Sequence, residues 1–220
     1  MTWSVLKQAG RDIWDELFYL ILFNVITLLG TILIIPWPLV IFGLYEMAYD
    51  IGQGKGIKFT SFFNRAVRVW KPAYIWGGIN LGAIIVLAIN VNFYANITAT
   101  WAGAAQIIMV GLLIVWVVLQ LLMLPIYPRL EEPDFRLALR NAAILIARYP
   151  FPVLIMLGIV AALIGLMVII PLFALLGVFS VIAVLSNRMM AEMVKRELGQ
   201  DVGNTSAQED PGFNIDGDEK

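Results

Sequence analysis

Residues 52–72, GQGKGIKFTSFFNRAVRVWKP, separate two apolar runs and decide how the chain is threaded through a membrane. The segment carries no acidic residue and five basic ones, which are Lys55, Lys58, Arg65, Arg68 and Lys71. Segments rich in lysine and arginine stay on the cytoplasmic side of the cell membrane. The segment therefore predicts which side of the bilayer this part of the chain faces.

The composition on either side of this segment predicts an integral membrane protein. Of the 220 residues, 60% are hydrophobic and 14% charged, whereas soluble domains have roughly 45–50% and 25%. Apolar runs at 17–35, 75–89, 107–126 and 153–186 approach or exceed the roughly 20 residues that cross a bilayer as a helix. Polar and apolar residues do not alternate as they do in barrel strands. We therefore expect an all-α polytopic membrane helix bundle in the cell membrane.

Histidine and cysteine are both missing from the sequence. Their absence removes thiolate nucleophiles, the commonest metal ligands and the usual acid or base at neutral pH. We expect a protein that is not an enzyme, with no cofactor, no metal site and no nucleic-acid partner. Asp12, Asp15 and Glu16 stand where a signal peptide would be basic, so we expect the first helix to be retained.

Prolines divide the two longest apolar runs. Residues 17–49 would form a helix of about 50 Å, too long for one crossing, and Pro36 and Pro38 break it. Residues 151–187 are flanked by basic residues on both sides, so this run is expected to cross twice and turn at Pro171. Within a membrane domain at 1–198, this predicts six spans and cytoplasmic termini, with spans at about 17–35, 38–50, 73–91, 104–126, 152–169 and 172–187. Five spans are the alternative, if Pro36 and Pro38 only kink one tilted helix.

Three hydrophilic segments have the spacing of amphipathic helices. The segment at 3–16 is expected to lie in the membrane interface. The other two lie in the cationic excursions, one from Phe59 to Trp70 and one following Asp134 as N-cap. Their basic side chains are candidates for binding anionic lipid or a membrane-protein partner, which includes a second copy of the chain; they are Lys58, Arg65, Arg68, Lys71, Arg136 and Arg140. The alternative is that these charges only anchor the topology.

Residues 199–220 hold six carboxylates and one lysine, which predicts a disordered acidic tail.

Four polar residues in the predicted spans are candidate intramembrane sites: Asn24, Asn80, Gln120 and Glu46. The three amides have two interpretations, a path for a neutral solute or hydrogen bonds between helices. Glu46 lies four residues before Asp50, near the cytoplasmic end of its span. A carboxylate in a span is a candidate functional group, but with Lys55, Arg65 and Arg68 nearby we favour ion pairing over a proton relay.

The order of several short motifs resembles the YesL family of bacterial membrane proteins, a family of unknown function. The matching elements are Asn24, Pro36 ahead of Gly43-Leu44-Tyr45, Phe62-Phe63, Asn90 with Phe93-Tyr94, Leu124-Pro125, Arg140-Asn141-Ala142, Pro150 and Asn187-Arg188. The resemblance implies a prokaryotic plasma-membrane protein with five or six helices, often encoded beside genes for carbohydrate uptake and polysaccharide degradation. It implies no catalytic or substrate residues.

These observations favour a non-enzymatic accessory or scaffold protein, linked to solute uptake. A small-solute transporter or channel lined by Asn24, Asn80 and Gln120 is the alternative.

Overall fold

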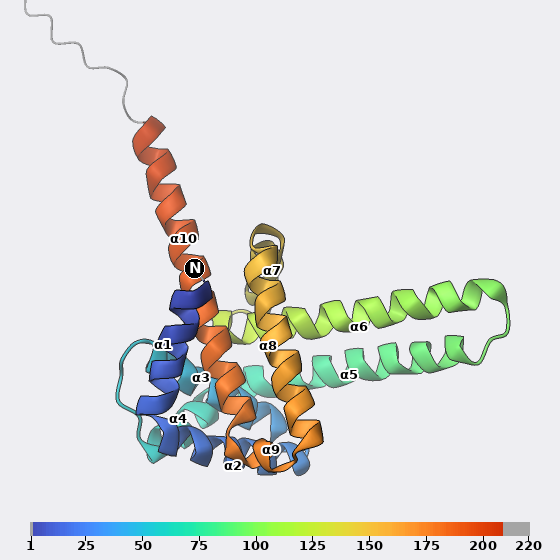
Figure 1. Ribbon diagram of the computed structural model, residues 1–220, viewed down its shortest axis with the longest axis horizontal. Helices are drawn as coiled ribbons and strands as arrows, with labels where there is room; N and C mark the ends of the chain where they lie inside the picture. Colours follow the sequence, from blue (N-terminus) through green and yellow to red (C-terminus); the bar gives the residue numbers. More distant parts are fainter. Residues whose placement is uncertain (1, 209–220) are drawn as a thin grey trace, which may run out of the picture.

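The computed structural model describes residues 2–208, with the side chains of residues 3–197 and 199, and this part of the chain consists of helices and short connections without a strand (Figure 1). The helices in chain order are α1 (Thr2–Asp15), α2 (Leu17–Ile32), α3 (Trp37–Gly52), α4 (Phe59–Arg68), α5 (Trp70–Ala95), α6 (Thr100–Ile126), η1 (Tyr127–Arg129), α7 (Phe135–Arg148), α8 (Pro150–Ile169), α9 (Leu172–Leu176) and α10 (Val178–Gln208). The predicted all-α class is confirmed.

Helix α3 is the centre of the fold. Eleven of its sixteen residues are buried, and it contacts α2, α4, α5, α6 and α10. A helix that is apolar on all sides is stable only when other elements cover it. Here Phe42 makes edge-on ring contacts with Trp76 of α5 and Tyr127 of η1, at centroid distances of 5.4 and 5.2 Å. The second predicted span is thus the core of the protein.

The break predicted at Pro36 separates two helices that fold back on one another. Helix α2 ends at Ile32, and Pro36 is the N-cap of α3. The two helices pack together, and Phe23 of α2 stacks on Phe62 of α4 with ring centroids 4.8 Å apart. A single kinked helix, on which the five-span alternative depends, is not formed in this region.

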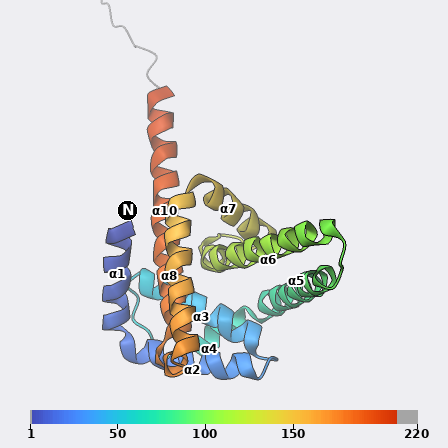
Figure 2. The same ribbon diagram turned by 45° about the vertical axis from the view of Figure 1, so that its right-hand side comes forward.

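The α5–α6 hairpin projects away from the body of the molecule (Figures 1 and 2). Only four of the 26 residues of α5 are buried, all of them at or before Asn80. In α6 the buried residues are Ala102 and six of the last seven positions. The outer parts of both helices pack on each other and leave large apolar side chains exposed.

Helix α10, near the C-terminal end of the described chain, packs against helix α1 at the N-terminal end. Helix α8 ends at Ile169, and the chain turns through Pro171 and α9, as the proline predicted, before α10 begins. Helix α1 packs along α10 and buries Val5 and Ala9, so the expected interfacial helix has a protein partner on one face. The backbone of α10 continues to Gln208. It passes the boundary expected at residue 198, while residues 209–220 of the expected tail lie outside the described residues.

By length and composition, three helical stretches in the described part of the chain could cross a membrane: α5, α6 continued through η1, and α8. Helices α1 and α2 would add a fourth crossing only as a single broken span, since they meet at an angle of 87°. Helix α3 has sixteen residues, fewer than the roughly 20 of a typical span. In both views α8 runs crosswise to the α5–α6 hairpin (Figures 1 and 2). A helical bundle is confirmed, but six crossings are not.

Candidate functional site

The carboxylates of α3 form a cluster of ion pairs with α4. Glu46 and Asp50 are one turn apart on α3 and are 6% and 5% exposed. Arg65 contacts both, with Nη1 3.3 Å from Glu46 Oε2 and Nη2 against Asp50 Oδ2. Arg68 lies 3.5 Å from Glu46 and Lys55 lies 3.8 Å from Asp50. The expected pairing of Glu46 and Asp50 with these three cations is confirmed.

The close packing of α4 against α3 positions this cluster of ion pairs. A Cβ atom at Gly43 of α3 would lie 3.1 Å from the Cβ of Ala66, so the two backbones are close to contact. Phe62 and Ala66 are the buried face of α4, and Arg65 follows Phe62 by three positions, within one turn. The apolar face of α4 therefore brings Arg65 to the carboxylates of α3.

An open cleft of about 550 Å³ adjoins the ion pairs. Its charged lining residues are Glu46, Asp50, Lys55, Arg65 and Arg68. The rest of the lining comes from α3, from the start of α5 and from the η1–α7 connection, and its residues are Tyr49, Val69, Pro72, Tyr127, Pro128, Leu130 and Pro133. Residues of the segment 52–72 and of the η1–α7 connection therefore meet at one cleft.

The six candidate cations for lipid or partner binding divide into two groups. Arg65 is half-buried and committed to Glu46 and Asp50. Lys58, Arg68, Lys71, Arg136 and Arg140 are exposed. Among these, Arg68 makes the long contact to Glu46 described above, and Lys71 lies over the Trp70 ring at 5.6 Å. The exposed cations at 58–71 and on α7 can reach an anionic surface, whereas Arg65 is held by Glu46 and Asp50.

Helix α7 begins as its sequence predicts. The side chain of Asp134 accepts a hydrogen bond from the backbone N–H of Arg136 at 3.3 Å, which makes Asp134 the N-cap. Ala138, Ala142 and Leu145 form the buried face. Arg136 and Arg140 consequently lie on the exposed side of the helix.

Asn24 of α2 holds the joint between α9 and α10. Its Nδ2 donates to the carbonyl oxygens of Ala174 and Leu175 at 2.6 and 3.2 Å, and its Oδ1 accepts from the N–H of Phe179 at 2.9 Å. This joint contains Gly177 at φ +133°, a conformation that favours glycine. Asn24 is fully buried, so its amide bonds helices together at this position.

Asn80 and Gln120 are brought together by the base of the α5–α6 hairpin. Gln120 Oε1 accepts from Trp76 Nε1 at 2.8 Å and from Asn80 Nδ2 at 3.4 Å. Asn80 Nδ2 also donates to the Trp76 carbonyl at 2.9 Å, and Asn80 Oδ1 accepts from Trp116 Nε1 at 3.1 Å. Asn24 is engaged at a different joint, so the three amides do not line one common path.

Arg129 is not among the candidate residues predicted from the sequence, yet it connects three elements inside the fold. Its guanidinium donates to Asn187 Oδ1 at 2.7 Å, to the Asn187 carbonyl at 2.9 Å and to the Pro125 carbonyl. It also lies 4.8 Å above the Tyr49 ring. Arg129 thus joins η1 to α10 and α3. Pro125 and Pro128 hinted at a bend, but nothing in the sequence named the partner 58 residues away.

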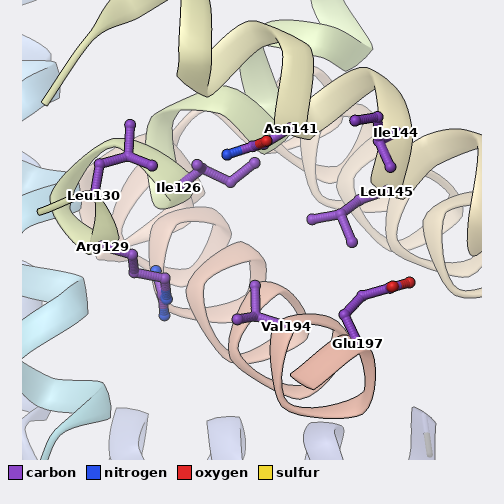
Figure 3. Close-up of a pocket in the computed structure, with 8 residues that line it drawn as sticks. All are labelled: Ile126, Arg129, Leu130, Asn141, Ile144, Leu145, Val194 and Glu197. Atoms are coloured by element: carbon purple, nitrogen blue, oxygen red, sulfur yellow. The ribbon is translucent and has the colours of Figure 1, made fainter. Parts of the chain in front are cut away.

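A second pocket of about 340 Å³ lies between the end of α6, α7 and α10 (Figure 3). Arg129, Asn141 and Glu197 are its polar residues, and Ile126, Leu130, Ile144, Leu145 and Val194 complete the lining. Glu197 pairs with Arg148 of α7. Partial burial raises the pKa of the neighbouring Tyr149 phenol, and the Glu197 carboxylate raises it further. Two of its three polar residues, Arg129 and Glu197, are thus already engaged with neighbouring elements.

No group of three or more potential ligands for a metal ion occurs among the described residues. Comparisons with family models, curated proteins and solved structures gave no match. The similarity to the YesL family therefore stays a prediction from short motifs.

Proposed function

We propose that the protein is a non-enzymatic scaffold or accessory protein of the cell membrane. The observation that carries the proposal is the contrast between its two surfaces. The hairpin α5–α6 and helix α8 expose long apolar faces that suit lipid. The residues flanking α4 include the exposed Lys58 and Lys71, and α7 exposes Arg136 and Arg140. Apolar faces anchor a protein in the bilayer, and nearby cations hold anionic headgroups at about 1 kcal/mol for each charge near the surface.

The arrangement of buried polar groups favours a scaffold over a transport path. Asn24 forms hydrogen bonds with the backbone of the α9–α10 connection. The side-chain oxygens of Asn80 and Gln120 accept hydrogen bonds from the indole N–H groups of tryptophans. A separate groove reaches Gln120, and its other lining side chains are apolar or aromatic. A transporter for a neutral solute would need polar groups facing water along its path. In proteoliposomes we therefore expect sugar flux no greater than in protein-free vesicles, and a clear excess would favour the transporter alternative.

For topology we propose that the basic excursions and both termini face the cytoplasm. The sidedness of these segments is tested with single cysteine substitutions at Thr2, Asn92 and Glu131, because the natural chain has no cysteine. A membrane-impermeant maleimide added from outside should label only the Asn92 variant. Labelling of the Thr2 variant from outside would contradict the six-span topology and cytoplasmic N-terminus.

Anionic lipid binding is tested by lipid analysis of the protein in nanodiscs made from phosphatidylglycerol and phosphatidylcholine. The variants Lys58→Gln/Lys71→Gln and Arg136→Gln/Arg140→Gln each remove two exposed charges, and each should reduce the phosphatidylglycerol retained after delipidation. The matched control Lys7→Gln/Arg11→Gln removes two exposed charges from α1. Equal losses in all three variants would contradict a specific role for α4 and α7.

The association with solute uptake rests on the YesL resemblance alone. Chemical crosslinking in native membranes followed by purification tests it, and the expected product is a defined complex with a membrane component of an uptake system. Recovery of the chain without a reproducible partner would contradict the accessory role.

A further inference from the structure

An apolar groove of about 270 Å³ opens where five helices converge. Its walls come from α3, from the base of α5, from the last third of α6, from α8 and from the start of α10. The lining side chains are apolar or aromatic apart from Gln120, for example Leu44, Leu121, Leu157 and Phe179. Val117 and Ile164 of the lining are 51% and 44% exposed. The groove is therefore continuous with the apolar outer faces of α6 and α8.

Gln120 supplies one unused hydrogen-bond donor in this groove. The residue is 8% exposed, and its Nε2 has no hydrogen-bond partner among the described residues. The orientation of the amide is fixed, because Trp76 Nε1 and Asn80 Nδ2 can only donate and both reach the same Gln120 atom. That atom must be the oxygen, so the unpaired atom is the NH₂ group. A buried donor without an acceptor is costly to the fold.

We propose that this groove binds one acyl chain of a membrane phospholipid, whose ester carbonyl accepts a hydrogen bond from Gln120 Nε2. The apolar walls exclude a sugar or an ion, and the exposed faces at the mouth point to entry from the bilayer. A single unpaired buried donor among apolar and aromatic walls matches a chain that carries one acceptor at its end. The inference assumes the membrane location proposed above and is independent of the scaffold role.

The test uses the full-length protein in bilayers with a phospholipid that carries a photoactivatable diazirine in its acyl chain. Crosslinks mapped by mass spectrometry should be enriched in the α3 segment 41–45 and the α8 segment 157–164. Leu157→Trp fills the groove and should reduce these crosslinks at least fivefold. The matched control Leu154→Trp changes an exposed site on the same helix and should leave them unchanged. Uniform labelling of the apolar surface, or equal labelling in the two variants, would overturn the proposal.

The hydrogen bond has its own test. Native mass spectrometry should show one bound ester-linked phospholipid retained several-fold more than its ether-linked analogue, which lacks the carbonyl. Gln120→Leu should abolish this preference, and the comparison of the two lipids on the natural chain stands even if that variant fails to fold. Equal retention of the two lipids by the natural chain would overturn the role of Gln120. Membrane fractionation distinguishes the two proposals, because a chain found in membranes without groove crosslinks contradicts only the lipid site.

Discussion

Helices α3 and α5 are both dominated by apolar residues, yet they have opposite environments. Eleven of the sixteen residues of α3 are buried by protein, whereas only four of the 26 residues of α5 are. Hydrophobicity alone therefore identifies segments that avoid water, but it does not distinguish a helix that faces protein from one that faces lipid. The two kinds of helix are distinguished by whether their residues need charged partners or close packing from neighbouring helices.

Two features of α3 require protein neighbours. It carries Glu46 and Asp50, which need the cations of α4. It also has a small residue, Gly43, and Ala66 of α4 packs directly against it. No residue between Lys71 and Arg129 is charged. The outer half of the α5–α6 hairpin therefore has no charged side chain that needs a partner from the protein.

The largest difference is expected between two leucines of α6. Leu122 is fully buried against the body, and Leu112 is 48% exposed on the hairpin. Leu122→Ala should lower the free energy of unfolding by about 2–5 kcal/mol, because it leaves a cavity. Leu112→Ala should change it by less than about 0.5 kcal/mol. Unfolding in mixed micelles by detergent titration measures both, and equal losses would show that the hairpin is packed against protein.

Removal of the central cation is expected to have the next largest effect. Arg65→Gln leaves Glu46 and Asp50 buried without their main partner, which should destabilise the fold by about 3 kcal/mol. Lys58→Gln, an exposed neighbour on the same segment, is the control and should be nearly neutral. The same titration measures both variants. A neutral Arg65→Gln would show that the cluster is solvated rather than part of the core.

A smaller effect is expected where α5 closes on the start of α3. A Cβ atom at Gly77 would lie 2.4 Å from Pro38 Cγ, whereas at Gly78 nothing lies within 4 Å. Gly77→Ala should therefore cost about 1–3 kcal/mol through overpacking. Gly78→Ala should be neutral or stabilising by up to about 1 kcal/mol, because alanine favours the helix. If Gly77→Ala proved as stable as Gly78→Ala, the close contact of α3 with α5 would be wrong.

The smallest of these effects is expected at the α9–α10 joint. Asn24→Leu leaves the carbonyls of Ala174 and Leu175 and the N–H of Phe179 without their partner, at a cost of about 1–2 kcal/mol. Hydrogen exchange of the Phe179 amide should speed up at least tenfold, while amides in the middle of α8 keep their rates. Unchanged exchange at Phe179 would contradict the role of Asn24.

Features set by neighbouring residues could be predicted from the sequence. Pro36 and Pro171 break helices because they remove a donor and fix φ, and Asp134 caps α7 as expected. The pairing of Glu46 with Arg65 followed from the high cost of an unpaired carboxylate beside a basic segment.

Features set by distant residues could not be predicted. Asn24 lies 150 residues from Ala174, and Arg129 lies 58 from Asn187. No local pattern names such partners, since many amides and carbonyls could serve. For the same reason the apolar composition of α3 could not say which helices cover it.

The central claim is that the outer half of the α5–α6 hairpin lies in lipid while the body around α3 is closed by protein. Single cysteines introduced at Ile108, Leu112 and Val115, and at Glu131 as an aqueous control, can carry spin labels, because the natural chain has no cysteine. In bilayers, labels at the three hairpin sites should collide freely with oxygen and hardly with a water-soluble nickel chelate, and the label at Glu131 should show the reverse. Nickel accessibility at the hairpin equal to that at Glu131, or exclusion of both reagents, would contradict the claim.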